Sequence, residues 1–367
     1  MIRSYFYNLR FEYLLLPLFL FTASLRAQND SSRIIGVKIY TIDGKTDDLI
    51  SEWKELGINT AFVSREIAAD SSFRSEAKEQ NIDIFIIEPV FFNPEALAKD
   101  STLYAVTNKG NIARNDWVEF VCPSNRNYRK KIINRLKNDV KKLDPEGISI
   151  DFIRHFLYWE MVKPDQDSRS IEHGCFCRNC IQKFSDKKKI HLPDSISNTE
   201  RTAEYILNEH KNEWTQWKSD LITSTVREIT TELKKIKPGL KFNLHAVPWR
   251  LADYDGGIRT IAGQDLSQLK EYVDYISPMC YSFMLYRNSK WNHSVVEDMN
   301  LQANDRILPS IQVREEYRKE NITDKDFESY LINALRSPSR GVIFWSWEHL
   351  EKEPSKKLII KNLINHL

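Results

Sequence analysis

The chain has 367 residues, and its 53 lysines and arginines nearly balance its 51 aspartates and glutamates, giving a formal net charge of +2. This balance disfavours a nucleic-acid-binding face, so we expect no nucleic-acid partner. The sequence contains no phosphate loop, dinucleotide fingerprint or serine elbow, and we therefore expect no cofactor.

The first 27 residues have the pattern of a secretory signal peptide. Arg3 and Arg10 precede the apolar run YLLLPLFLF, and small residues between Ala23 and Ala27 offer a cleavage site. The run is short for a membrane span, which takes about 20 apolar residues, and an uncleaved anchor is the alternative. We expect a secreted or periplasmic protein in which residues 28–367 form one domain, with no membrane partner beyond the signal peptide.

Apolar runs of strand type recur along the rest of the chain, and they are rich in β-branched and aromatic residues. Runs that are apolar throughout suit parallel strands that are covered on both faces. The eight runs are residues 34–40, 58–64, 82–92, 147–152, 240–247, 273–281, 306–313 and 341–347.

Segments with helix signals follow these runs. In the clearest, Trp214, Trp217 and Leu221 fall on one stripe, and Pro238-Gly239 ends the helix. Eight strand–helix units in about 330 residues match a (β/α)8 TIM barrel of the α/β class. An open doubly wound sheet is the rival, but its usual glycine-rich first turn is missing after the first run.

A long insertion, residues 155–212, follows the fourth run. Loops after the strands build the active face of a barrel, so this segment should wall or cover the substrate groove. Three cysteines and a histidine could ligate zinc. Alternatively, two of the cysteines form a disulfide, with the third free or paired with Cys122, or all are plain buried thiols. The four residues are His173, Cys175, Cys177 and Cys180.

Acids near the strand ends are the candidates for catalysis. Glycoside hydrolysis needs one carboxylic acid to protonate the leaving oxygen and one carboxylate as nucleophile or base. Asp151 ends the fourth run, Glu88 lies near the end of the third, and Glu348 follows the eighth. Arg154 would lower the pKa of Asp151, which favours Asp151 as nucleophile or base and leaves Glu88 or Glu348 as the acid. Structural alternatives are an Asp151–Arg154 salt bridge, a turn at Glu88 and a helix cap at Glu348.

Polar and aromatic residues near the strand ends are the candidates for substrate binding, because aromatic rings stack on the apolar faces of sugars. Strand alternation places Trp345 and Trp347 on one side, where one would floor the pocket and the other would pack the rim. A single histidine on a strand, such as His245, is as often a core residue as a substrate contact. The candidates are Arg154, His245, Trp249, Tyr281, Trp345 and Trp347.

Short motifs across residues 34–350 resemble a glycosyl-hydrolase-like group of (β/α)8-barrel proteins, distantly related to family 18 chitinases and α-amylase-like glycoside hydrolases. The motifs are FVCPSNRNYRKKII, GISIDFIR, CFCRNC, YISPMCYS and GVIFWSWE. The resemblance implies a barrel that hydrolyses O-glycosidic bonds, with Asp151 as a catalytic carboxylate.

Two departures from these relatives change what the resemblance implies. The acid that ends the chitinase motif D-x-x-D-x-D-x-E is replaced by Ile153, which argues against the acetamido-assisted route of chitinases. Where an amylase-like barrel carries a glutamate after strand five, this chain offers His245 and Arg250. The partner of Asp151 is therefore not assigned by the resemblance.

These patterns predict an exported glycoside hydrolase that cleaves O-glycosidic bonds of a poly- or oligosaccharide by carboxylate acid/base catalysis, with the carbohydrate as its partner. The alternative is a non-catalytic carbohydrate-binding protein on the same scaffold. A third hypothesis makes the cysteine motif a metal site that activates water.

Overall fold

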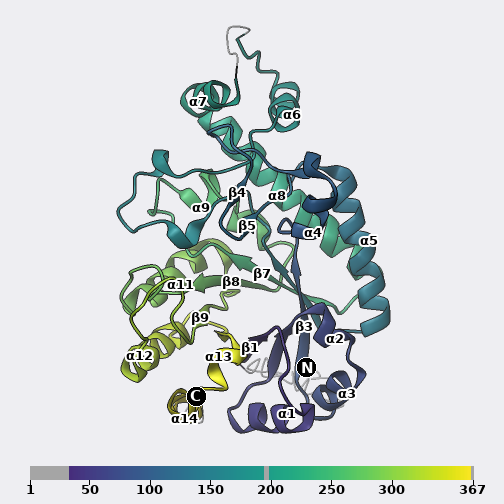
Figure 1. The fold of residues 1–367 in the computed structure, drawn as a ribbon, viewed down its shortest axis with the longest axis vertical. Coiled ribbons are helices and arrows are strands. Elements are labelled where there is room, and N and C mark those ends of the chain that lie inside the picture. The colour runs from purple at the N-terminus through teal and green to yellow at the C-terminus, as the bar shows by residue number, and fades with distance from the viewer. Residues whose placement is uncertain (1–32, 194–197, 365–367) are drawn as a thin grey trace, which may run out of the picture. The chain divides into compact units, whose positions relative to one another are not determined.

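The computed structural model describes residues 33–193 and 198–364, and within them eight parallel strands close into a barrel (Figure 1). Going round the barrel, the order is β1, β10, β9, β8, β7, β6, β3 and β2. The strands are β1 (Ile34–Ile39), β2 (Thr60–Val63), β3 (Asp83–Pro89), β6 (Gly147–Asp151), β7 (Lys241–Ala246), β8 (Tyr275–Cys280), β9 (Ser310–Gln312) and β10 (Gly341–Trp345). The predicted (β/α)8 barrel is confirmed. The predicted signal peptide, residues 1–27, lies outside the described residues.

Helices connect the strands and cover the outside of the barrel. The first set comprises α1 (Thr46–Glu55), α2 (Arg65–Ala69), α3 (Ser71–Glu79), α4 (Pro94–Lys99), α5 (Arg126–Leu143), α8 (Lys211–Lys234) and the 3-10 turn η1 (Ser101–Leu103). The second set comprises α9 (Gly257–Thr260), α10 (Leu266–Leu269), α11 (Lys290–Ala303), α12 (Asp324–Leu335), α13 (Trp347–Leu350) and α14 (Pro354–Ile364). None of the helices in the described ranges is long and apolar enough to cross a membrane.

The barrel interior is apolar at one end and polar at the other. Five buried side chains from β2, β3, β10 and the segment just before β9 pack together near the amino ends: Phe62, Phe85, Ile87, Leu308 and Ile343. Gly36 makes room for them, because a Cβ atom there would lie 2.6 Å from the Phe62 ring. Further along, Ser149 bonds His245 (2.9 Å) and Asn243 (3.0 Å). These polar groups lie below the carboxyl ends of the strands, where barrel enzymes carry their sites.

Between β6 and β7 the chain leaves the barrel. This insertion contains η2 (Trp159–Met161), η3 (Ser168–Ser170), α6 (Arg178–Lys188) and α7 (Thr199–Glu209), and it leads into α8 (Figure 1). The β-bridge Leu157–His173 lies within the insertion. The β-bridge Thr107–Gly174 joins the insertion to the loop after β3. That loop carries a small hairpin of β4 (Arg114–Asn115) and β5 (Val118–Glu119). The two loops therefore meet beside the barrel mouth.

Candidate active site

A cavity of about 420 Å³ lies at the carboxyl ends of the barrel strands. Its walls come from β1, β6, β8 and β10, from the loops after β3, β8 and β9, and from the insertion after β6. The lining residues are Lys38, Tyr40, Phe92, Trp117, Asp151, Phe152, Arg154, Trp159, Glu160, Met279, Tyr281, Met284, Glu316, Tyr317 and Trp345. Eight of them are aromatic, and three are carboxylic acids. The cavity is thus suited to an apolar ring face with polar substituents.

Asp151 is the last residue of β6, and its side chain is buried in the cavity wall. Its Oδ1 accepts the backbone N–H of Phe152 at 2.7 Å, and its Oδ2 lies 3.9 Å from Nζ of Lys38. Burial alone raises the pKa of this carboxyl, but His245, Lys38, the Phe152 N–H and Arg154 together lower the pKa below its usual value. Since burial lowers the pKa of His245 to about 3, that ring is neutral at pH 7. Asp151 is therefore an ionised carboxylate at neutral pH, held so mainly by Lys38 and the N–H.

Glu160 has the opposite protonation behaviour in the same cavity. It lies in the turn η2, half-buried, and its Oε2 is buried without a hydrogen-bond partner among the described residues. Burial raises its pKa to about 7, Arg154 opposes the rise, and the charge of Asp151 adds to it. A carboxyl that keeps its proton near neutral pH is fitted to act as a general acid. Asp151 and Glu160 thus form a pair whose environments push their pKa values apart, which is the pattern expected of an acid and its partner carboxylate.

The two other acids predicted to be catalytic lie elsewhere. Glu88 points out of the barrel, since its neighbour Ile87 faces the interior and successive side chains of a strand alternate. There its carboxylate is paired with Arg65 (3.0 Å) on α2 and with Arg135 on α5. Glu348 accepts the backbone N–H groups of Tyr40 (2.6 Å) and Thr41 (2.9 Å). Neither glutamate lines the cavity.

Of the six residues predicted to bind substrate, three line the cavity: Arg154, Tyr281 and Trp345. The Tyr281 and Trp345 rings are stacked with their centroids 4.4 Å apart. Arg154 donates to the carbonyl of Leu157 (2.8 Å) and lies over the Phe120 ring, so it secures the start of the insertion. Asp151 pairs with Lys38 in place of the salt bridge to Arg154 that the sequence offered as an alternative.

The other three predicted contacts are packed away from the cavity. His245 is buried inside the barrel and bonded to Ser149. Trp249 is buried against Tyr254, with ring centroids 4.5 Å apart. Trp347 begins α13 and packs on Trp53 at 5.6 Å, because β10 ends at Trp345 and the strand alternation ends with it.

Lys38 and Glu160 line the cavity but were not among the residues selected from the sequence. Lys38 had a signal, since it is a charged residue within an apolar run, like Asp151. Glu160 was one candidate acid of the long insertion, like Glu172, but the sequence did not single it out, because it lies in a 3-10 turn of an irregular segment where no periodicity indicates which side chains face inward.

The cysteine motif forms a cluster of four thiols. All five cysteines lie in the described part of the chain, and none of them forms a disulfide. Sγ of Cys122 lies 3.6 Å from Cys175, 3.6 Å from Cys177 and 3.4 Å from Cys180, well beyond the roughly 2.05 Å of an S–S bond. His173, predicted as a ligand, instead bonds the carbonyl of Ile171 at 3.0 Å. Cys122 takes its place, because the fold brings the segment before α5 against the insertion.

Four sulfur atoms within 4.8 Å of one another fit a tetrahedral zinc ion. Four thiolates would fill the coordination sphere and leave no open position for a water, as is usual at structural zinc sites. None of the four cysteines lines the cavity. Metal bound here would fasten the insertion to the loop after β3, and it would not activate water at Asp151.

No family model and no curated protein matches the chain. Solved structures of glycoside hydrolases do match its fold. The glycoside hydrolase domain of PgaB (BpsB) from Bordetella bronchiseptica has a TM-score of 0.68 at 11% identity, over 90% of this chain and 98% of that domain. This chain therefore shares the barrel fold of that domain.

Two β-galactosidases match over a similar share of the chain. The enzyme from the psychrophilic Marinomonas ef1 has a TM-score of 0.65 at 10% identity, over 90% of this chain and 58% of that enzyme. The enzyme from Bacillus circulans sp. alkalophilus has a TM-score of 0.64 at 14% identity, over 92% and 56%. This chain therefore spans a little over half the length of these β-galactosidases. The resemblance predicted from the sequence motifs is confirmed for the fold.

Proposed function

We propose that the protein is an exported glycoside hydrolase in which Asp151 and Glu160 are the catalytic carboxyl groups. One observation carries the proposal: a single aromatic cavity at the barrel mouth holds one carboxyl with a lowered pKa and one whose pKa is raised to about 7. Two carboxyl groups in these protonation states are what hydrolysis of a glycosidic bond requires. The fold shared with glycoside hydrolases supports the proposal. Export rests on residues 1–27 alone.

In this mechanism Glu160 donates its proton to the glycosidic oxygen as the bond to the anomeric carbon breaks. Asp151 attacks that carbon or removes a proton from the attacking water. Lys38 keeps Asp151 ionised, and the Tyr281–Trp345 stack offers a ring face for the sugar. Glu88, which the sequence suggested as the acid, instead joins β3 to α2 and α5.

A product assay tests the proposal. The protein is incubated with a panel of plant, fungal, bacterial and host glycans, and released saccharides are identified by mass spectrometry. New oligosaccharides from one class of glycan, released by wild type and by a Glu88→Gln control but not by Asp151→Asn, would support the hydrolase. If wild type releases nothing from any glycan yet binds one, the protein is a carbohydrate-binding protein on the same scaffold.

A further inference from the structure

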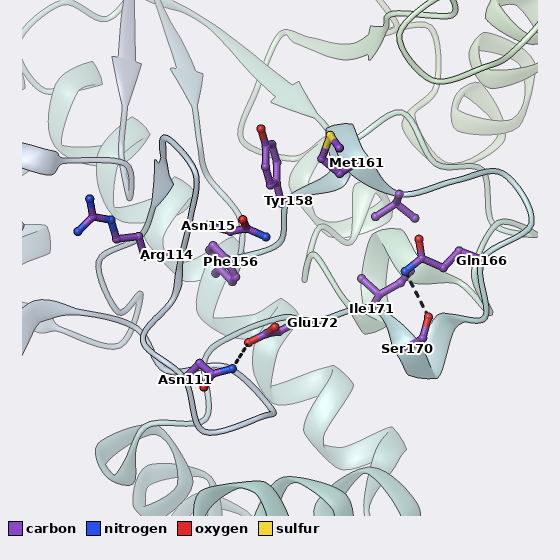
Figure 2. A pocket seen from close by; sticks show the side chains of 11 residues that line it. Asn111, Arg114, Asn115, Phe156, Tyr158, Met161, Gln166, Ser170, Ile171 and Glu172 are labelled. Carbon is purple, nitrogen blue, oxygen red and sulfur yellow. Dashed lines mark hydrogen bonds between the residues drawn. The ribbon is translucent and has the colours of Figure 1, made fainter. Parts of the chain in front are cut away.

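A second hollow, of about 340 Å³, adjoins the site on the insertion side (Figure 2). One wall is the hairpin segment 111–115, and the other is the segment 156–172 of the insertion. The lining residues are Asn111, Arg114, Asn115, Phe156, Tyr158, Met161, Val162, Gln166, Ser170, Ile171 and Glu172. Its volume is within the range of small-ligand pockets, about 300–1,000 Å³.

The polar groups of this hollow are held in place by its own loops. Gln166 donates to Ser170 Oγ at 3.2 Å, and Glu172 accepts from Asn111 Nδ2 at 3.0 Å, as Figure 2 shows. Glu172 also accepts from Thr107 Oγ1 at 2.6 Å. These fixed planar groups, with the exposed Arg114 and Asn115 opposite, can bond pairs of adjacent hydroxyl groups.

An apolar surface lies beside these polar groups. Phe156 and Ile171 are buried beneath it, while Met161 is 57% exposed at the hollow. A surface with one apolar patch and several amide, guanidinium and carboxylate groups is suited to a sugar ring, which has an apolar face and a rim of hydroxyls.

The same short turn divides this hollow from the catalytic cavity. In η2, Trp159 and Glu160 line the cavity, and the next residue, Met161, lines the second hollow. Tyr158, also in the hollow, lies edge-on to Trp117 and Tyr317 of the cavity, with ring centroids 6.3 and 6.2 Å away. A chain molecule that passes this aromatic wall can therefore occupy both spaces.

We propose that the second hollow binds a sugar unit of the substrate that lies some way along the chain from the bond cleaved. The substrate is then an oligo- or polysaccharide whose recognition extends beyond the sugars at Asp151 and Glu160. This inference rests on the proposed function, but it concerns different residues.

Binding as a function of chain length tests it. The full-length Asp151→Asn protein is titrated calorimetrically with cello-, xylo-, manno- and chito-oligosaccharides of two to six units, then again with Asn115→Ala and Gln166→Ala added. The control adds Gln182→Ala, an exposed glutamine on α6 that bonds Asp186 at 2.8 Å in a comparable way. We expect the double change to weaken binding of the six-unit chain about tenfold, as loss of one or two good hydrogen bonds would, and to leave the two-unit chain unchanged.

Equal affinity for short and long chains in the parent, or equal losses for both lengths in the double variant, overturns the second subsite. Binding that depends on length and on Asn115 and Gln166, without cleavage by wild type, leaves the subsite standing and overturns the hydrolase. If wild type cleaves a glycan but the double change has no effect on binding, the hydrolase stands and the second subsite is overturned. Absence of binding to every chain contradicts both.

Discussion

Replacing Glu160 by glutamine should make the protein more stable at alkaline pH, because the folded state resists ionisation of this side chain. The pKa of Glu160 rises from an ordinary 4.5 to about 7. At about 1.4 kcal/mol per pH unit, ionising it costs the folded protein up to about 3 kcal/mol more than the unfolded chain. Glu160 is half-buried, so solvent screening makes this figure an upper bound.

The sign follows from the raised value. Below about pH 4.5 Glu160 is protonated in both states, and the variant and wild type should be equally stable on this account. As pH rises from about 4.5 to 7, wild type loses stability that the glutamine variant keeps. The stability difference should therefore grow to about 2–3 kcal/mol above pH 7.5.

Urea unfolding followed by tryptophan fluorescence, from pH 4.5 to 8.5, measures this difference. The contributions of groups that titrate alike in both proteins cancel when the two free energies of unfolding are subtracted. Asp151→Asn is the matched control: the pKa of Asp151 is lowered in the folded state, so its stabilising contribution is fully present above the ordinary value of 3.8 and is lost only at more acid pH. The Asp151→Asn difference should therefore stay constant from pH 4.5 to 8.5. A Glu160→Gln difference that does not change with pH would refute the assigned environment of Glu160.

Three further predictions test the other groups. Lys38→Met removes the cation beside Asp151 and should move the acidic limb of the kcat/KM–pH profile to higher pH; an unmoved limb would mean that Lys38 does not hold the carboxylate ionised. Glu88→Gln should leave kcat and KM per folded molecule unchanged in steady-state assays, because this carboxyl lies outside the barrel between Arg65 and Arg135; a large loss of kcat would return Glu88 to the chemistry. Cys122→Ser should abolish zinc binding, measured by mass spectrometry of metal content, while His173→Ala retains it; the reverse result would restore the His173 ligand set.

The barrel could be predicted from the sequence because each strand is a short apolar run, and covered parallel strands must be apolar on both faces. Asp151 was predictable for the same reason, as a charge that ends such a run marks the barrel mouth. The role of Glu88 could not be predicted, because the two faces of a fully apolar strand look alike in sequence. The structure shows that Ile87 faces the barrel interior, and the Glu88 carboxyl therefore points outward.

The rest of the site depends on contacts between distant segments. Glu160 reaches the cavity because the insertion folds back over the barrel mouth and Arg154 secures its start. Cys122 joins the thiol cluster from a segment more than fifty residues before the other cysteines. Local spacing could suggest three ligands, but the fourth depends on how the two loops after β3 and β6 pack.

The most direct test of the central claim compares two substrates with different leaving groups: the glycan identified by the product assay and the dinitrophenyl glycoside of its terminal sugar. If Glu160 is the acid, Glu160→Gln should lower kcat/KM on the glycan by about 10²–10⁴ and leave the dinitrophenyl glycoside nearly unaffected, since that leaving group departs without a proton. Asp151→Asn should lose activity on both. A Glu160→Gln variant that cleaves the glycan as well as wild type, or that loses both substrates equally, would contradict the account.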